Sequence, residues 1–397
     1  MRPIVCLGDV HEGIGFGIRV DPDTGISERA LDLHNNFAAA ARWAVNSNAA
    51  LFCVLGDLFD RAHIAPTFRE MVRRDVIEPL GKAGIETWLL AGNHDQPRSF
   101  NRATSLDDYR GYSHVKVIRM PTVMEREIDG RKITFILMPY LHPDQVIELA
   151  RRNLKEEIAP DRAFDTAKAI WREWIRKRAE ESKADWTLLF GHFEIEGAQY
   201  SSITTREVLP GDTSFGREIL PPKVDLAVFG HIHKHQVLWD RLIYTGAPER
   251  IDWGERLDEK GFVVLHPEDK GWEFVKLPAR EMLRIPVAIG PSDEPTAKIL
   301  AALPRDATAK MLRVEVSIPE TMRARVDERA LSDRLKDSFS YEFVWTSPER
   351  EKIKADEFTL DPVRLLREFI SQQYKDHPRR AEIMEEGERL LREVLHQ

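Results

Sequence analysis

The chain has few cysteines, no long apolar run and no excess of positive charge. Its 397 residues include only two cysteines, Cys6 and Cys53, too few for a thiolate metal site or a disulfide-rich scaffold. Both lie inside short apolar runs, where a thiol most often serves as a small core side chain. No apolar run approaches the roughly 20 residues of a membrane-spanning helix, and no charged-then-apolar leader opens the sequence. We therefore expect a cytoplasmic protein that does not bind membranes.

The formal charge of −8 argues against a dedicated nucleic-acid coat protein, because such proteins are usually basic. It does not exclude an enzyme that acts on DNA, since bound divalent ions supply positive charge where a phosphate lies. Basic residues do cluster, at Arg98 and Arg102, at Arg151 and Arg152, and at residues 176–178. For any one cluster, the simpler interpretation is a solvated helix face.

Five short apolar runs are each followed by residues that can bind metal ions. Such runs are typical of buried strands, and ligand crevices form at the carboxyl ends of strands in α/β sheets. The side chains at these ends are Asp9, His11, Asp57, Asn93, His192, His231 and His233. Together they suffice for two divalent ions that share one bridging carboxylate, for which Asp57 is the candidate. Imidazole, carboxylate and amide ligands without thiolate suit Mn²⁺, with Mg²⁺, Fe²⁺ or Zn²⁺ as alternatives.

His94 directly follows a predicted ligand, Asn93. A side chain in that place can reach a substrate instead of an ion, so His94 is the candidate general acid. We expect Asp95 to orient its imidazole or to stabilise its charge. Each motif alone is common, and the force of the prediction lies in five of them occurring in order at strand ends.

Helical and strand patterns divide the chain into three predicted parts. Residues 1–280 alternate strands with helices, residues 281–346 form a small α+β unit, and residues 347–397 hold a polar linker and two amphipathic helices. In the first part we predict helices over 27–46, 66–83 and 165–182, a hairpin over 115–138 that turns at Asp129-Gly130, and strands over 236–239, 242–245, 261–265 and 272–275. In the second we predict strands over 312–318 and 341–345 and a helix over 328–338. The glycine-rich stretch between His11 and Ser27 is either a substrate-contacting loop or a surface insertion.

The ordered motifs resemble those of the calcineurin-like metallophosphoesterases. They are Asp9-Val10-His11, Gly56-Asp57, Gly92-Asn93-His94-Asp95, Gly191-His192 and Gly230-His231-Ile232-His233. Residues 56–61, 92–97, 138–140 and the stretch from 244–250 through 260–262 look further like the SbcD branch, the nuclease subunits of DNA double-strand-break processing complexes. The likeness covers about residues 1–280 well and the remainder in architecture only.

This resemblance implies a four-layer αββα sandwich with a small α+β capping domain and C-terminal helices. One ion would be held by Asp9, His11, Asp57 and His233, and the other by Asp57, Asn93, His192 and His231, with His94 as the catalytic histidine. Archaeal and eukaryotic relatives often have a histidine at the position of Asp60. Bacterial relatives commonly have an aspartate there, as this chain does. We expect Asp60, Arg61 and Asp95 to support the ligands or to contact substrate.

The expected function is that of a metal-dependent DNA nuclease, exonuclease or endonuclease, in DNA end processing and double-strand-break repair. Its expected partners are DNA and an SbcC-type coiled-coil ATPase, and a homodimer is compatible with it. The C-terminal helices would either pack back onto the α+β unit or dock the ATPase through the apolar residues Val363, Leu366, Ile370, Met384 and Leu391. Alternatives are a small-substrate phosphodiesterase or phosphatase of the same superfamily, and a scaffold subunit without activity. The C-terminal hundred residues favour DNA over a small substrate, and the complete ligand set argues against an inactive scaffold.

Overall fold

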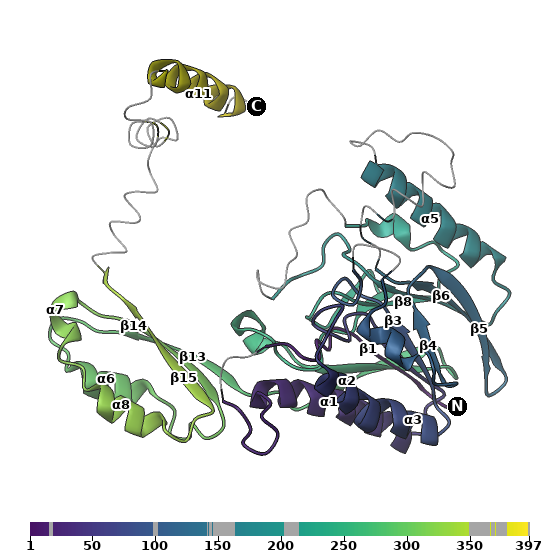
Figure 1. The fold of residues 1–397 in the computed structure, drawn as a ribbon, viewed down its shortest axis with the longest axis horizontal. Coiled ribbons are helices and arrows are strands. Elements are labelled where there is room, and N and C mark those ends of the chain that lie inside the picture. Colours follow the sequence, from purple (N-terminus) through teal and green to yellow (C-terminus); the bar gives the residue numbers. More distant parts are fainter. Residues whose placement is uncertain are drawn as a thin grey trace. The chain divides into compact units, whose positions relative to one another are not determined.

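The computed structural model divides the chain into two compact units, Met1–Met282 and Leu283–Gln397, which we describe one at a time (Figure 1). The described residues are 1–15, 19–97, 102–140, 142, 145, 163–201, 214–348, 366, 370 and 379–395. Among the sequence predictions, those for Arg98, Arg151, Arg152, Val363 and the helix start at residue 361 lie outside this set.

The first sheet of unit 1 contains three of the five predicted ligand-bearing strands. Its order is β12 (Gly271–Lys276), β11 (Gly261–His266), β1 (Ile4–Leu7), β2 (Leu51–Leu55), β3 (Glu86–Leu90) and β4 (Val115–Ile118). β1 to β4 pair in parallel, whereas β11 is antiparallel to β1 and to β12. Helices α1 (Glu28–Asn46), α2 (Pro66–Val72) and α3 (Glu78–Lys82) pack on its outer face. A π-helical turn, Arg73–Ile77, joins α2 to α3 inside the single helix predicted over 66–83.

The second sheet holds the other two ligand-bearing strands. Its order is β5 (Thr122–Ile128), β6 (Arg131–Met138), β7 (Trp186–His192), β8 (Leu226–Gly230), β10 (Leu242–Tyr244) and β9 (Gln236–Leu238). The hairpin predicted over 115–138 is wrong in its first strand, because β4 joins the first sheet beside β3. Only β5 and β6 form the hairpin, with Asp129 and Gly130 both at positive φ in its turn.

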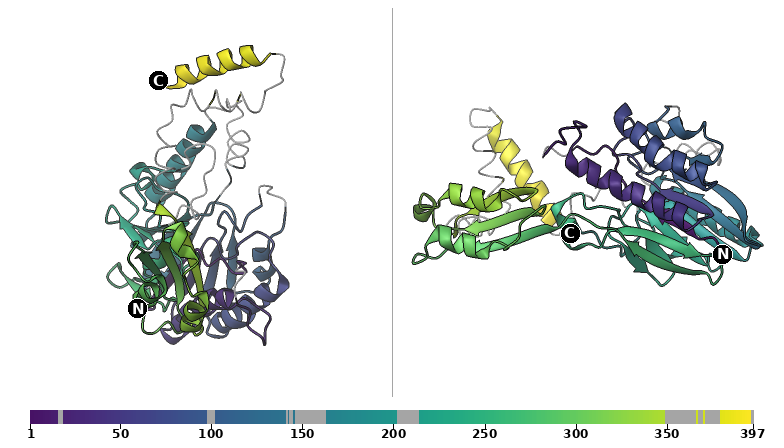
Figure 2. Two further views of the ribbon diagram at one scale, coloured as in Figure 1. Left: turned by 90° about the vertical axis from the view of Figure 1, so that its left-hand side faces the viewer. Right: turned by 90° about the horizontal axis from the view of Figure 1, so that it is seen from below.

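Alternate residues of each central strand enter different cores, which explains why these strands are apolar throughout. Val5 and Leu7 face α1, while Ile4 and Cys6 lie between the two sheets. On the far side of the second sheet, Ile136 and Leu189 pack against helix α5 (Ala163–Glu181). The layers are therefore helix, sheet, sheet and helix, seen from two further directions in Figure 2. The predicted α/β sandwich is confirmed.

Unit 2 is built on a small sheet of β13 (Met282–Ala288), β14 (Met311–Ser317) and β15 (Ser340–Thr346). Helices α6 (Pro295–Ala302), α7 (Glu320–Arg323) and α8 (Glu328–Leu335) accompany it. Its core includes Ile299, Leu312, Val314 and Leu331. The sequence analysis predicted β14, α8 and β15. It did not predict β13, which contains Pro286, or α6, which follows the turn-rich residues 289–295.

Helix α11 (Arg380–Leu395) packs against two residues of the preceding segment. A Cβ added at Gly387 would lie 3.2 Å from Leu366 Cδ2 and 3.6 Å from Ile370 Cδ1, and Ile370 is only 3% exposed. Leu366 and Ile370, two of the five residues expected to anchor a partner, thus contact α11. No helix within the described ranges is long and apolar enough to cross a membrane.

Candidate metal centre

The strand ends of the two sheets meet at one place and bring the predicted ligands together. The backbone N–H of Asp9 donates to the carbonyl of Gly56 at 3.0 Å, which ties the end of β1 to the end of β2. The backbone N–H of His231, which follows β8 in the second sheet, donates to both oxygens of Asp9 at 2.9 and 3.0 Å. Convergence at the carboxyl ends of strands, which the sequence pattern predicted, is therefore observed across both sheets.

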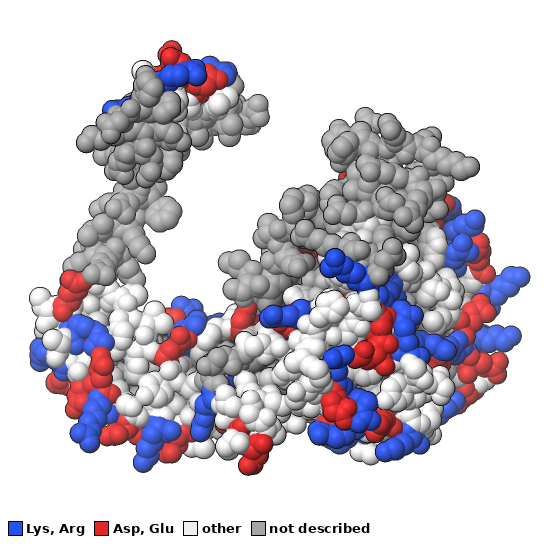
Figure 3. Space-filling model, in the orientation of Figure 1, with Lys and Arg blue, Asp and Glu red and all other residues white. Residues whose placement is uncertain are grey.

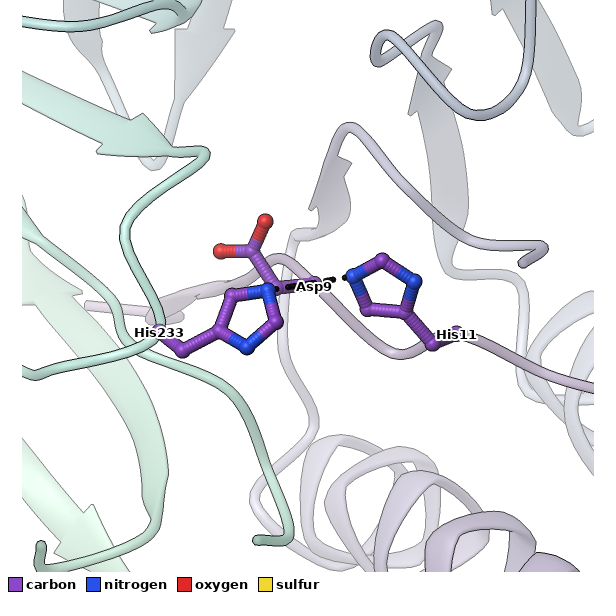
Figure 4. A group of neighbouring side chains, drawn as sticks. All are labelled: Asp9, His11 and His233. Atoms are coloured by element: carbon purple, nitrogen blue, oxygen red, sulfur yellow. Dashed lines mark hydrogen bonds between the residues drawn. The ribbon is translucent and has the colours of Figure 1, made fainter. Parts of the chain in front are cut away.

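One half of the centre consists of Asp9, His11 and His233 (Figure 4). Their ligand atoms all lie within 4.8 Å of one another, and all three residues are buried. The two histidines meet ring nitrogen to ring nitrogen, with 3.1 Å between His11 Nε2 and His233 Nε2. At most one of the two can donate in this contact, so the other presents a lone pair towards the centre.

The other half gathers around His192, at the end of β7. The Nδ1–H of His192 donates to the carbonyl of Leu55 at 2.8 Å, so its Nε2 points at the centre. That nitrogen lies 2.9 Å from Asn93 Oδ1 and 3.1 Å from Asp57 Oδ2. His231 Nδ1 lies 3.1 Å from the same Asn93 oxygen. Asp57 also belongs to a second group of possible ligands with His11 and His94, so it connects the two halves.

A positive charge is strongly favoured beside Asp57. Burial lowers the pKa of His192, yet the adjacent Asp57 carboxylate outweighs burial and raises that pKa to about 9. Burial likewise raises the pKa of Asp57, but His192, followed by His94 and His11, lowers it well below its usual range. For His231, burial and the neighbouring His192 together lower the pKa to about 3, so its ring is neutral and able to act as a ligand.

The backbone at the centre is held in an unusual conformation. Asp9, His11, Asp57 and His231 have positive φ angles of 54°, 52°, 52° and 90°. Non-glycine residues in this region cost of order 1–3 kcal/mol each and cluster at functional sites. The surrounding fold must compensate for this cost to keep the four side chains directed inward.

Two glycines leave the space that the ligands occupy. At Gly56, which has φ +94°, a Cβ would lie 2.1 Å from His192 Nδ1. At Gly92 a Cβ would lie 2.1 Å from Asp57 Oδ1 and 2.4 Å from the Asp57 backbone nitrogen. Glycine at the ends of these strands is therefore required for the ligands to approach one another.

His94 lies at the edge of the same group, as predicted from its place after Asn93. Its ring is 4.7 Å from that of His11, and its backbone N–H donates to Asp57 Oδ1 at 2.9 Å. The ring Nδ1 lies 2.8 Å from the carbonyl of Asp60. Because a carbonyl can only accept, Nδ1 carries the proton in this contact.

The remaining predicted residues are also placed near the centre. The carboxylate of Asp95, expected to orient His94, accepts the backbone N–H groups of Leu58, Phe59 and Gly92 at 3.0 to 3.2 Å. It thereby joins the loops after β2 and β3, and burial together with nearby Asp57 raises its pKa to about 6. Asp60 Oδ1 lies 3.6 Å from His11 Nδ1. Arg61 pairs with Asp60, and its side chain is 70% exposed.

Sequence reasoning missed the groups on the far side of His233. Glu255 lies on the 3₁₀ turn η5 (Trp253–Leu257), and its Oε1 is 2.8 Å from His233 Nδ1. Burial raises the pKa of Glu255, but His233 and Lys260 outweigh burial and lower it to about 2. Neither Glu255 nor Lys260 belongs to a periodic pattern. Lys260 lies in the SbcD-like stretch after the last histidine motif, but no role was predicted for it or for Glu255. Tyr140, which follows β6, was also missed, and its buried ring lies 6.2 Å from that of His231.

The donor set fits divalent metal ions. Four imidazoles, two carboxylates and one amide oxygen converge without thiolate, a combination that suits Mn²⁺, Fe²⁺ or Zn²⁺. A neutral His192 would direct a lone pair at two oxygens about 3 Å away, and a cation between them removes that repulsion. Within the described residues, the buried His11 Nδ1 has no partner within hydrogen-bond distance, and the nearest carboxylate oxygen is Asp60 Oδ1 at 3.6 Å.

Comparison with known proteins identifies the family. The family model described as calcineurin-like phosphoesterase matches residues 2–235, more than half of the chain. The chain belongs to the calcineurin-like phosphoesterases. These are metal-dependent hydrolases of phosphoesters with dinuclear metal centres, and the His and Asp groups described above are the candidate ligands.

This chain is also similar to several solved structures of other proteins. A dimetal phosphatase from Danio rerio is 11% identical, with a TM-score of 0.32 over 66% of this chain and 91% of that one. A hypothetical protein from Thermus thermophilus is 15% identical, with a TM-score of 0.32 over 70% and 100%. The sulfate thiohydrolase SoxB from Thermus thermophilus is 10% identical, with a TM-score of 0.33 over 70% and 56%. The assignment of this chain to the calcineurin-like phosphoesterases depends on the family match.

Proposed function

We propose that this phosphoesterase is a DNA nuclease that depends on two divalent ions, with Mn²⁺ as the preferred metal. The observation that carries the proposal is the convergence of Asp9, His11, Asp57, Asn93, His192, His231 and His233 at strand ends of both sheets. In the assignment we favour, Asp9, His11, Asp57 and His233 would hold one ion. Asp57, Asn93, His192 and His231 would hold the second, with Asp57 contributing to both.

The chain's own residues divide the remaining work. When bound, a pair of divalent ions supplies charge stabilisation for the entering and leaving oxygens of a phosphoryl displacement. His94 is the proposed general acid, because the Asp60 carbonyl fixes its Nδ1–H and leaves Nε2 as the nitrogen that delivers a proton to the departing oxygen. Asp95 keeps Asn93 and Asp57 at a constant separation by joining their two loops through backbone amides.

The choice of DNA over a small substrate rests on unit 2 and on the motifs around the ligands. Residues 283–397 lie beyond the family match and form a separate unit with its own core. A hydrolase of small phosphoesters has no need of such a unit, whereas a polynucleotide offers a long backbone for it to contact. The SbcD-like stretches at residues 56–61 and 92–97 favour the same substrate.

We propose that the bound metal ions, more than the protein surface, attract the phosphate of the substrate. In the face drawn in Figure 3, basic and acidic side chains are interspersed over the described surface. The basic cluster at residues 176–178 illustrates this, since Arg176 pairs with Glu173 and Glu180, and Arg178 pairs with Glu181. These arginines form a solvated, ion-paired helix face rather than a phosphate-binding patch.

We further propose that the chain works in DNA end processing and double-strand-break repair, together with an SbcC-type ATPase that binds its C-terminal helices. Leu366 and Ile370, which lie against α11 at Gly387, support this part of the proposal, because they are apolar and do not belong to the described core cluster of unit 2.

The test is a cleavage assay on linear DNA beside a chromogenic phosphodiester, with Mn²⁺, Mg²⁺, Fe²⁺ and Zn²⁺ supplied in turn. We expect metal-dependent cleavage of DNA that weakens steeply with added salt, because phosphate contacts release counterions. Asp57→Ala serves as the reference, since loss of the shared carboxylate should abolish both metal binding and cleavage. Efficient turnover of a cyclic nucleotide with no action on DNA would place the chain among small-substrate phosphodiesterases instead.

A further inference from the structure

A fully buried ion pair lies directly behind one of the proposed metal ligands. Glu255 on η5 and Lys260, just before β11, both have side chains that are 0% exposed, with Lys260 Nζ 2.7 Å from Glu255 Oε2. Charged side chains of this kind are rarely buried without a reason, because removing them from water costs several kcal/mol per ion. Neither residue belongs to the proposed ligand set.

Both members of the pair contact His233, one at its ring and the other at its backbone. Glu255 Oε1 lies 2.8 Å from the ring nitrogen Nδ1, and Lys260 Nζ donates to the backbone carbonyl at 3.1 Å. The other Glu255 oxygen also accepts the backbone N–H of Ile251 at 3.1 Å. The carboxylate is thus held by three donors, and His233 is held through its ring and its backbone at once.

This arrangement determines which nitrogen of His233 faces the centre. An ionised carboxylate can only accept, so Nδ1 of His233 must carry the proton in this contact. In the neutral ring the lone pair is then on Nε2, the atom that lies 3.1 Å from His11 Nε2. Histidine ligands are commonly oriented in this way by a carboxylate on the opposite nitrogen.

We propose that Glu255 and Lys260 are positioning residues that hold His233 in its metal-binding tautomer and orientation. The inference rests on the two-ion function proposed above and deepens it. Glu255 acts on the ring directly. Lys260 acts through Glu255 and through the His233 carbonyl, and it balances the charge of a carboxylate that is fully buried. Only the half of the centre that contains His233 depends on the pair.

The experiment compares Glu255→Gln and Lys260→Met with a matched control, Glu249→Gln, in the full chain. Glu249 is another buried carboxylate of unit 1, held by Asn36 and the backbone of Arg250, and it contacts none of the proposed ligands. Calorimetric titration with Mn²⁺ should resolve two binding steps. We expect Glu255→Gln to weaken one step by about 10- to 100-fold and to leave the other unchanged. Lys260→Met should weaken the same step, and Glu249→Gln should weaken neither.

A second measurement needs no metal at all. The ¹⁵N shifts of the His233 ring, recorded in the metal-free chain at alkaline pH, should report protonation at Nδ1 in the parent and a mixture of tautomers in Glu255→Gln. Protonation at Nε2 in the parent would overturn the inference, as would unchanged Mn²⁺ binding by Glu255→Gln or equal weakening of both steps. If the parent chain binds no pair of ions, the proposed function fails, and the ring shifts still decide the role of Glu255.

Discussion

Three imidazoles of the centre share one arrangement, in which an oxygen atom of the protein holds Nδ1. His192 is held by the carbonyl of Leu55, His94 by the carbonyl of Asp60, and His233 by the carboxylate of Glu255. A ring anchored in this way has a defined tautomer and loses little rotational freedom when an ion or substrate binds. The same kind of contact at Nδ1 thus orients both the proposed metal ligands and the proposed acid. Whether Nε2 meets an ion or a substrate then decides the role of the ring.

The role of His94 can be separated from metal binding by one substitution. His94→Asn should keep both ions, because the Asp57 contact of residue 94 is made by its backbone N–H. Cleavage of DNA with saturating Mn²⁺ should fall by about 10²–10⁴-fold, the usual contribution of a general acid or base. The control is His266→Asn, at a histidine on β11 that pairs with surface carboxylates. A parental cleavage rate for His94→Asn would assign His94 another role.

The convergence of the proposed ligands could be predicted from sequence, whereas most of the contacts that hold them could not. Asp9, His11, Asp57 and the others are polar groups that end apolar runs, and such groups stand out in a linear pattern. Two of the anchors, at Leu55 and Asp60, are backbone carbonyls, which every residue has. Asp95 was expected beside the ring of His94, and its contacts with three backbone amides depend on loop geometry that no motif encodes.

Among the secondary-structure elements, the buried strands were the most predictable. Their apolar runs are continuous because both faces of each sheet are covered, which makes the strand ends easy to recognise. The assignment of strands to sheets was less predictable. The apolar residues of β4 fit either a hairpin or the edge of the first sheet, and only pairing with β3 decides between them. The strand β13 gave no clear signal in the sequence, because Pro286 lies within it.

The close approach of the strand ends leads to a test at Gly92. Gly92→Ala places a Cβ against both the backbone and the carboxylate of Asp57, so one strand end must shift. We expect a loss of about 1–3 kcal/mol in the free energy of unfolding, as is usual for overpacking, and weaker Mn²⁺ binding. Chemical denaturation and the metal content of the purified protein measure the two effects.

Gly111→Ala is the matched control, because a Cβ at Gly111 meets nothing within 4 Å. It should leave the unfolding free energy within about 0.5 kcal/mol of the parent, as surface substitutions usually do. If Gly92→Ala bound Mn²⁺ as tightly as the Gly111 variant, the spacing of the two strand ends would not limit the centre.

For the whole molecule, the chain divides into two units, and every proposed ligand lies in unit 1. The described core of unit 2 consists of residues from Val287 to Leu335. Among the described residues, Leu366, Ile370 and helix α11 add no member to that core. The C-terminal helices were predicted from their apolar stripes, but a stripe alone does not distinguish a docking helix from one that packs on its own domain.

Removal of residues 361–397 is the test of that distinction. We expect the shortened chain to keep metal-dependent cleavage of DNA and to lose association with an SbcC-type ATPase, together with any cleavage stimulated by ATP. Co-purification with the ATPase and cleavage with and without ATP are the measurements. If the shortened chain unfolds, or if it still binds the ATPase fully, the helices are structural and the partner contacts another surface.

A point substitution in the full chain checks the same prediction without removing an element. Leu390 on α11 is 49% exposed, whereas Ile370 is buried and lies against α11. Leu390 is therefore the better candidate for a partner contact. Leu390→Asp should weaken ATPase association and leave folding unchanged, because an exposed side chain contributes little to the free energy of unfolding. Met120→Asp changes a comparably exposed apolar residue of unit 1, at 42%, and should leave association intact. Equal effects of the two substitutions would point to a general effect of added surface charge instead of a docking contact on α11.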